Sequence, residues 1–493
     1  MSEKKQVYNP FLPLNVCIPD GEPHVFGDRV YLFGSHDKEG GETFCMLDYE
    51  VWSAPVDDLK SWRSEGITYR AEQDPDYKER PFMYAPDVVR GNDGRYYLYY
   101  CMSGRDGVGG YHGPISVAVC DTPAGKYEYL GYVRYPDGTP MKKYVCFDPG
   151  VINDNGTIYI YYGTRYEFEE DCPDFADNEQ LIQQEMAMFG KSREEILGTP
   201  ESVMGPSVVT VGDDMLTITS EPRHIIPYKV KGTSFEEHPF FEAPSMRKAN
   251  GRYYFIYSSR QNHELCYAVS DKPDRDFVFG GTIVSNGDVG YNGRPESERL
   301  NMTGTTHGSI EQINGKWYVF YHRLTHKSDY SRQACAEPIE IAADGSIAQV
   351  PISSCGLNGA PLKAEGSYPA GIACMITNGD MPHGCNRIFN DRVFPHCDND
   401  DTDRYIGEMT DGTLIGYRWF DFKGGETLTI KLRGKGGSVA VTDGEGVSLG
   451  KADFAPSESW QDVVIPLSVK AGVSELRLTF SGELSDMLEI SFG

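Results

Sequence analysis

Five polar side chains stand at comparable places in a sequence pattern that recurs along the chain. Each lies ten to twelve residues before a tyrosine of the pattern, and the five are Asp20, Asp87, Asp148, Glu242 and His307. Carboxyl groups that converge in a confined space repel one another, so at least one of them has a raised pKa unless a cation compensates. Proton-transfer catalysis needs such a separation of acid and base pKa values. Any one of these Asp residues could be explained by turn formation alone, but three acids at matching positions favour catalysis.

The recurring pattern is a Gly-containing turn followed by a strand of alternating aromatic residues. Its copies read GDRVYLFGS, DGRYYLYYCMS, NGTIYIYYGT, NGRYYFIYSS and NGKWYVFYHR, and each predicts the turn and second strand of a β-hairpin. The equivalent tyrosines are Tyr31, Tyr97, Tyr159, Tyr254 and Tyr318, spaced 66, 62, 95 and 64 residues apart. A period of about sixty residues is typical of four-stranded propeller blades. We therefore expect a five-bladed β-propeller whose innermost strands carry the polar side chains to one mouth of its central channel.

The 95-residue interval holds an acidic segment, from Glu167 to Leu197, that predicts a helix. Two interpretations stay open for it. It is either a solvated decoration between the third and fourth blades or one wall of a substrate cleft.

Composition and length predict an all-β protein with two domains. A chain of 493 residues exceeds the size at which one core usually keeps growing. The 32 Tyr, 23 Phe, 54 Gly and 30 Pro favour short strands joined by tight turns. We expect the propeller over residues 1–350, a linker over 351–370 and a β-sandwich (jelly-roll) domain over 371–493, where short alternating strands follow one another.

The charge balance excludes two classes of partner. A formal charge of −27 would repel nucleic acid phosphates and anionic membrane surfaces. The opening MSEKKQVYNPF has no apolar signal-peptide core, so we expect a cytoplasmic bacterial protein. None of the 12 cysteines falls in a CxxC pair, which favours reduced thiols over a zinc site or a redox motif. The oligomeric state is not predicted.

The segments around the recurring pattern resemble glycoside hydrolase family 43. They are IPDGEPHVFGDRVYLFGSHD, YAPDVVRGNDGRYYLYY, FDPGVINDNGTIYIYYG, FEAPSMRKANGRYYFIYSS and THGSIEQINGKWYVFYHR, and the resemblance covers roughly residues 9 to 345. It implies a five-bladed propeller and single-displacement hydrolysis with inversion at the anomeric carbon.

The resemblance also implies a role for each of three carboxyl groups. Asp20 matches the general base, Glu242 the general acid, and Asp148 the residue that orients the acid and raises its pKa. An inverting mechanism needs base and acid on opposite faces of the sugar, about 6.5–9.5 Å apart, so that a water fits between them. Opposing blades of a propeller can provide that gap.

Four further residues are candidates for binding. Arg332 matches an arginine that reaches the bound sugar, and Tyr84 stands where relatives often have an aromatic wall, although it could equally pack between blades. Asp87, in the same YAPD segment, is predicted to bind substrate with them. His307 matches a histidine near a hydrated calcium or sodium ion at the axis; a buried histidine without metal is the alternative.

The C-terminal part resembles carbohydrate-binding module family 6, mainly in ESWQDVVIPLSVKAGVSELRLTFSG. Tyr417, Trp419 and Trp460 are the aromatic candidates for a second sugar site. A structural domain packed on the propeller is the alternative, because Tyr417 and Trp419 point the same way on an alternating strand and can both be core.

These observations predict an exo-acting α-L-arabinofuranosidase that acts on small hemicellulose oligosaccharides such as those of arabinoxylan or arabinan. A β-xylosidase is the close alternative. Two alternatives from other classes are a sugar-binding propeller without catalysis and a protein-interaction propeller. All three carboxyl groups stand at matching positions, which disfavours both.

Overall fold

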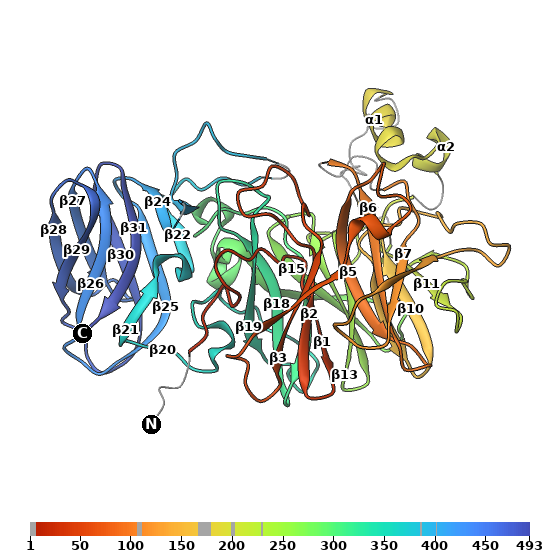
Figure 1. Cartoon of the computed structure of the whole chain (residues 1–493), viewed down its shortest axis with the longest axis horizontal. Coiled ribbons are helices and arrows are strands. Elements are labelled where there is room, and N and C mark those ends of the chain that lie inside the picture. Colours follow the sequence, from red (N-terminus) through yellow and green to blue (C-terminus); the bar gives the residue numbers. More distant parts are fainter. Residues whose placement is uncertain are drawn as a thin grey trace.

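The computed structural model describes residues 6–105, 111–165, 179–198, 203–227, 230–384, 387–400 and 402–493. Nearly every described element is a strand, and the two α-helices of these ranges are α1 (Glu179–Phe189) and α2 (Arg193–Ile196). Both helices lie in the segment expected to be helical, whose residues 167–178 fall outside the described ranges. In Figure 1 the helices project from the end of the molecule opposite the C-terminal sheets.

Five small antiparallel sheets make up the described part of the first two thirds of the chain. The first contains β1 (Glu22–Phe26), β2 (Arg29–Phe33), β3 (Tyr49–Pro55) and β4 (Arg63–Tyr69). The second contains β5 (Phe82–Arg90), β6 (Tyr96–Ser103), β7 (Ser116–Cys120) and β8 (Glu128–Tyr132). The third contains β9 (Gly150–Asp154), β10 (Thr157–Tyr162), β11 (Ser207–Val211) and β12 (Arg223–His224). The fourth contains β13 (Phe240–Ala249), β14 (Arg252–Ser259), β15 (Glu264–Ser270) and β16 (Val278–Ser285), and the fifth contains β17 (Ser309–Ile313), β18 (Lys316–Leu324) and β19 (Arg332–Ile339).

The first strands of the five sheets form a closed ring. Strand β1 contacts β5, β5 contacts β9, β9 contacts β13, β13 contacts β17, and β17 returns to β1. A bridge between Gly21 and Gly308 joins the first sheet to the fifth. Neighbouring sheets pack face to face through their aromatic and β-branched side chains; Tyr99, Val117, Ile160 and Val209 share one such core. The ring therefore brings residues hundreds of positions apart to a common centre.

Two larger sheets form the C-terminal unit, at the opposite end of the molecule from the helices (Figure 1). One contains β20 (Leu362–Lys363), β22 (Met375–Thr377), β25 (Leu414–Phe422), β27 (Gly437–Thr442), β28 (Ser448–Phe454) and β30 (Gly472–Gly482). The other contains β21 (Gly366–Pro369), β23 (His396–Asn399), β24 (Arg404–Met409), β26 (Thr427–Gly434), β29 (Ser457–Pro466) and β31 (Ser485–Phe492). Side chains from both sheets, such as Ile415 and Ile490, share one buried core. Strands β20 and β21 already pair within this unit, so its sheets begin inside the stretch expected to be linker.

The aromatic candidates of the C-terminal unit do not share one environment. Tyr417 is fully buried in the core, whereas Trp419 is half-buried. The expectation that both point the same way is wrong, because the pairing of β25 with β30 shifts register between Tyr417 and Phe420. The Trp460 ring lies 4.2 Å from the Arg433 guanidinium, and its Nε1 donates to Asp403 at 2.8 Å.

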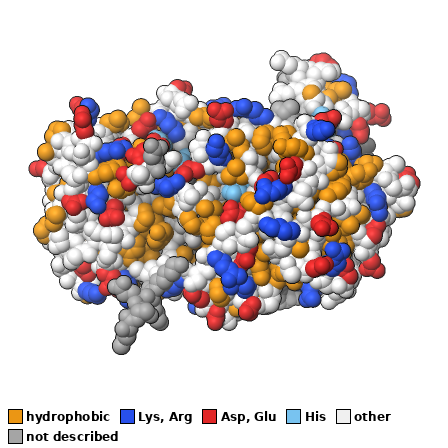
Figure 2. Space-filling model, in the orientation of Figure 1, with side chains coloured by type: hydrophobic (Ala, Val, Ile, Leu, Met, Phe, Trp, Pro, Cys, Tyr) orange, Lys and Arg blue, Asp and Glu red, His pale blue; other side chains and the backbone are white. Residues whose placement is uncertain are grey.

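The surface and the cysteines add two observations. Figure 2 shows acidic and basic side chains interspersed on the visible face, without a patch of one sign. The ten cysteines that the structure describes are buried free thiols. Across those same ranges, no helix has the length and apolar character needed to cross a membrane.

Candidate active site

Strand register defines which residues of the five sheets are equivalent. Each repeat tyrosine pairs with a residue of the first strand in its sheet, and these partners are His24, Val89, Ile152, Arg247 and Glu311. Four positions before them stand Asp20, Ala85, Asp148, Ala243 and His307. The first four of these have positive φ values of 57°, 29°, 48° and 65°. Non-glycine residues rarely adopt this conformation, and it concentrates at functional sites.

The same register corrects the predicted alignment of two acids. Glu242 precedes Ala243 by one position and is therefore equivalent to Tyr84, while Asp87 follows Ala85 by two positions. Counting from the tyrosines gave ten residues for Asp87 and twelve for Glu242, compared with eleven for Asp20. The register moves Asp87 one position further, because Val89 and Tyr97 are eight residues apart whereas the other four pairs are seven apart. Only Asp148 and His307 occupy the position equivalent to Asp20.

Asp20 is held by a buried arginine. Nη1 of Arg332 donates to Asp20 Oδ1 at 2.8 Å, and its Nε and Nη2 donate to the two oxygens of Asp37 at 2.8 and 3.0 Å. Burial alone would raise the pKa of Asp20, but the Arg332 guanidinium holds it below its usual value. Asp20 is therefore ionised at neutral pH, as a general base must be.

The pKa values of Glu242 and Asp148 are raised, in contrast to that of Asp20. Burial, followed by the charge of Asp20, raises the pKa of Glu242 to about 8. Burial and the neighbouring carboxyls of Glu242 and Asp20 also raise the pKa of Asp148. Like charges this close cannot both ionise readily, so the Asp148–Glu242 pair retains a proton at neutral pH. One centre thus contains a proton acceptor and a proton donor.

His307 lies among the carboxyl groups. Its Nδ1 is 3.8 Å from Asp20 Oδ1 and 3.8 Å from Asp148 Oδ2, and its Nε2 is 3.9 Å from Glu22 Oε1. Burial lowers the pKa of His307 to about 4, so the ring is neutral at pH 7. Glu22 Oε1 is buried and has no hydrogen-bond partner among the described residues. Burial raises the pKa of Glu22 to about 8, so without a cation this group is mostly protonated at pH 7. Its orphaned oxygen beside a neutral histidine fits a hard cation, which prefers oxygen ligands and would bind the ionised form.

Tyr84 lies in an aromatic cluster beside the carboxyl groups. It is 7% exposed, with Phe44 and Phe147 at ring distances of 6.4 and 5.9 Å in edge-on arrangements. The Arg332 guanidinium stacks over the Phe44 ring at 4.6 Å. The same apolar cluster includes Phe189 of α1 and Ile196 of α2. The two helices therefore pack on the aromatic side of the candidate site.

Asp87 belongs to a deeper level of the ring, away from the position predicted for substrate binding. Its Oδ1 lies 2.6 Å from His24 Nε2, and its Oδ2 accepts a hydrogen bond from the Val151 N–H at 2.7 Å. At the same depth Arg247 Nη2 donates to Glu22 Oε2 at 2.8 Å. Asp87 is fully buried, and both its oxygens are engaged within the protein. This arrangement ties neighbouring sheets together below the acids.

Sequence reasoning missed three residues of the centre: Asp37, Glu22 and His322. Both oxygens of Asp37 accept hydrogen bonds from the Arg332 guanidinium. His322 Nδ1 accepts a hydrogen bond from the Asp20 N–H at 3.3 Å, and its Nε2 bonds to the Thr305 carbonyl at 2.9 Å. The sequence contained a signal for each of these three residues. Asp37 and Glu22 stand inside the IPDGEPHVFGDRVYLFGSHD segment, and His322 directly follows Tyr321 in the last aromatic strand.

An ionised acid and a protonated acid in one centre, with a third carboxyl beside them, are the groups that hydrolysis of a glycosidic bond requires. The chain belongs to the glycosyl hydrolases family 43, whose family model matches residues 8–200 and 213–347. The family resemblance of the sequence is thereby confirmed, while the carbohydrate-binding-module resemblance of the C-terminal unit stays a prediction.

One known relative spans nearly the whole chain. It is 42% identical over 503 aligned residues to a xylosidase/arabinosidase from Thermoclostridium stercorarium, covering 99% of this chain and 98% of the relative. It is 30% identical to xylosidase/arabinosidase 43A from Humicola insolens, over 68% of this chain and 96% of the relative. Among solved structures, the GH43_1 enzyme from Xanthomonas citri in complex with xylose aligns with a TM-score of 0.53 at 26% identity, over 72% of this chain and 96% of that one. An exo-β-1,3-galactanase from Phanerochaete chrysosporium shares the fold across 99% of this chain and 98% of its own, with a TM-score of 0.51 at 12% identity.

Proposed function

We propose that this glycoside hydrolase is an inverting exo-enzyme that releases α-L-arabinofuranosyl units from hemicellulose oligosaccharides. The observation that carries the mechanism is the contrast between Asp20, whose pKa is lowered, and Glu242, whose pKa is raised to about 8 within the same centre. The substrate class rests on the two xylosidase/arabinosidase relatives. A β-xylosidase activity on xylo-oligosaccharides is the second candidate, favoured by the beta-xylosidase of Xylanibacter ruminicola, which is 30% identical over 67% of this chain.

In the proposed mechanism Asp20 removes a proton from a water molecule, and the water oxygen attacks the anomeric carbon. As the glycosidic bond breaks, Glu242 transfers its proton to the departing oxygen, so the leaving sugar is released as an alcohol and Glu242 becomes a carboxylate. Attack and departure on opposite faces invert the anomeric configuration. Asp148 keeps the proton on the acid by like-charge repulsion. Asp20 then releases its proton to solvent and Glu242 takes one up, which restores the starting protonation states.

Arg332 and Tyr84 support this chemistry in different ways. Arg332 already donates to Asp20 and Asp37, so its main role in this proposal is to keep the base ionised and correctly oriented; a hydrogen bond to the sugar would use its remaining donor. Tyr84, at the position equivalent to Glu242, forms an aromatic wall for the sugar. Helices α1 and α2 extend that wall, which favours a closed pocket and exo-action. Asp87 is assigned a structural role.

A calcium or sodium ion beside His307 fits the residues present. Glu22 Oε1 and the His307 ring would contact it, with water supplying the other ligands. Its contribution would be to neutralise carboxylate charge below the catalytic acids.

The architecture that we propose is a five-bladed propeller over residues 1–350 followed by a β-sandwich. The closed ring of five first strands supports the propeller, and the shared core of the two large sheets supports the sandwich. Because β20 begins at Leu362, the connecting segment is shorter than 351–370. We assign the sandwich a structural role, since Arg433 covers the Trp460 ring and Tyr417 is core.

Product chromatography on arabinoxylan, arabinan and xylan oligosaccharides tests the specificity. Arabinose released from the branched substrates, with xylobiose left intact, is the expected result. Xylose as the main product would favour the β-xylosidase. Binding of these sugars without any hydrolysis would instead favour a non-catalytic sugar-binding propeller.

A further inference from the structure

The segment that leads into Arg332 is paired with the C-terminal unit. Residues 325–331 connect β18 to β19, and Arg332 is the first residue of β19. Three backbone hydrogen bonds join this segment to residues 387–397: Cys397 N–H to the Thr325 carbonyl at 2.7 Å, Phe389 N–H to the Lys327 carbonyl at 2.9 Å, and Asp329 N–H to the Arg387 carbonyl at 3.0 Å. The segment that places the Arg332 guanidinium is therefore held in part by the other unit.

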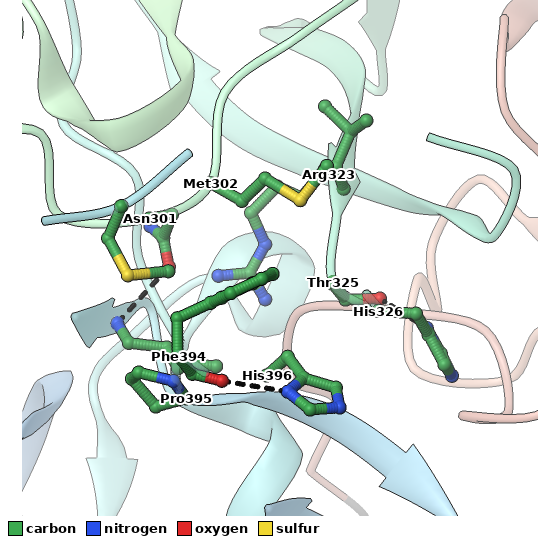
Figure 3. Close-up of a pocket in the computed structure, with 11 residues that line it drawn as sticks. Asn301, Met302, Arg323, Thr325, His326, Phe394, Pro395 and His396 are labelled. Atoms are coloured by element: carbon green, nitrogen blue, oxygen red, sulfur yellow. Dashed lines mark hydrogen bonds between the residues drawn. The ribbon is translucent and has the colours of Figure 1, made fainter. Parts of the chain in front are cut away.

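Side chains pack closely where this contact begins. Figure 3 shows Thr325 and His326 near Phe394, Pro395 and His396, which belong to the segment that leads into β23. The hollow that these side chains help to line has a volume of about 10 Å³, which is about the space of one water molecule. Close-packed interiors have low compressibility and transmit strain. A shift of the C-terminal unit would therefore displace the segment before Arg332.

A side-chain contact holds the second segment that touches Arg332. Asp37 accepts two hydrogen bonds from the Arg332 guanidinium, and Glu39 follows Asp37 by two positions. Arg404 of β24 reaches Glu39 from the C-terminal unit: its Nε donates to Oε1 at 2.9 Å and its Nη2 donates to Oε2 at 2.7 Å. A two-point contact of this kind fixes orientation as well as distance.

The pair formed by Arg404 and Glu39 is partly buried. The Glu39 side chain is 14% exposed and that of Arg404 is 35% exposed. Burial alone would raise the pKa of Glu39, but His326 and Arg404 lower it to about 2, so the carboxylate is charged at neutral pH. One position further, the Gly40 N–H donates to Ser331 Oγ at 2.9 Å, which joins this turn to the segment that leads into β19. The two segments around the active-site arginine are thus tied to each other and to β24.

Two other ion pairs join the units independently of Arg404. Arg418 pairs with Asp288, and both side chains are buried. Lys327 Nζ lies 2.8 Å from Glu408. These pairs should keep the C-terminal unit docked when Arg404 is replaced, so a substitution at this position tests one contact without separating the units.

We propose that Arg404 is a positioning residue of the active site, which acts through Glu39 to hold the Arg332 guanidinium in place. Arg332 orients the base Asp20, so the inference rests on the proposed function. The C-terminal unit thereby contributes to catalysis in addition to packing on the rest of the protein. Loss of the contact would let the guanidinium shift, and a displacement of about 1 Å in an active site can lower a rate about 100-fold.

Steady-state kinetics of the full chain on arabinoxylan and xylan oligosaccharides test the proposal. In Arg404→Met, kcat should fall about 10- to 100-fold with KM little changed, because the base acts in the chemical step. Arg404→Lys keeps the charge but loses the two-point fork, and it should recover part of the loss. Glu39→Gln should show a similar defect, and the double variant should be no worse than either single variant, because both remove the same contact.

Arg433→Met is the matched control. Arg433 is 26% exposed and pairs with Asp486 inside the C-terminal unit, and its replacement should leave kcat at the wild-type value. An unchanged kcat in Arg404→Met, or an equal loss in Arg404→Met and Arg433→Met, would overturn the inference.

Hydrogen exchange measured by mass spectrometry tests the positioning without any turnover. Well below the unfolding temperature, peptides from residues 36–45 and 325–332 should exchange faster in Arg404→Met than in the wild type or in Arg433→Met. Unchanged exchange would overturn the inference. If Arg404→Met fails to fold, Glu39→Gln decides by the same two measurements. A wild type that hydrolyses none of the sugars would refute the proposed function, while the exchange result would still decide whether Arg404 holds these segments.

Discussion

The replacement Glu242→Gln tests the catalytic assignment most directly. A pKa of about 8, compared with the ordinary 4.5, means that about nine in ten Glu242 carboxyls carry a proton at pH 7, compared with about one in three hundred for an unperturbed glutamate. The difference corresponds to about 5 kcal/mol in favour of the neutral form. The environment of Glu242 thus increases the population of the competent acid about 300-fold.

Two kinetic consequences follow from this protonation. In the wild type, kcat/KM should fall on the alkaline side with an apparent pKa near 8, because the acid loses its proton there. In Glu242→Gln, kcat on an unactivated oligosaccharide should drop about 10²–10⁴-fold, the usual contribution of a general acid, and the alkaline limb should disappear. An aryl glycoside with a good leaving group needs less protonation and should lose much less activity.

The assay is a pH–rate profile from pH 5 to pH 10 on both substrates, with sugar affinity measured by calorimetry to verify that the pocket is intact. Glu458→Gln is the matched control, since Glu458 is exposed on β29, and its profile should equal that of the wild type. An alkaline limb near pH 8 that persists in Glu242→Gln, or unchanged hydrolysis of the oligosaccharide, would refute the acid assignment.

Three further predictions concern the base, its arginine and the pH dependence of stability. Asp20→Asn should abolish hydrolysis, and azide should restore turnover by attacking the anomeric carbon; recovery of a glycosyl azide by mass spectrometry checks this. Arg332→Met should lower the free energy of unfolding by about 3–5 kcal/mol in urea titrations, since it strands two buried carboxyls, whereas Arg63→Met should leave it unchanged. Burial raises the pKa of Glu22 to about 8, so the folded state favours its protonated form. The contribution of this protonation to the free energy of unfolding is complete below about pH 4.5 and is lost as the pH rises to 8. The resulting fall, about 1.4 kcal/mol per pH unit, should be smaller in Glu22→Gln.

The repeated aromatic strands carried most of the fold information in the sequence. Alternating aromatic residues after a Gly turn define a hairpin locally, and their spacing marks the sheet units, so five hairpins and the C-terminal strands could be predicted without any tertiary knowledge. The three carboxyl groups were found for the same reason, because each stands a nearly constant distance from a repeat tyrosine.

The exact levels of the acids depended on tertiary structure. Once the strands are paired, Asp87 stands two positions beyond, and Glu242 one position before, the place occupied by Asp20. One of the two positions for Asp87 comes from its hairpin, in which the paired residues Val89 and Tyr97 are eight apart instead of seven. A bulge changes side-chain direction without leaving a clear sequence signal. Asp87, predicted from the sequence to bind substrate, lies deeper in the ring beside His24.

The sequence by itself determined which residues could do chemistry, the all-β class and the order of the hairpins, since these follow from residue type and short-range periodicity. Tertiary structure alone decided the protonation states. Asp20 and Glu242 are carboxyls of the same centre, and they differ because Arg332 reaches one of them from 312 positions along the chain while desolvation and repulsion dominate the other. Electrostatic energy depends on distances in space, and those exist only once the ring has closed.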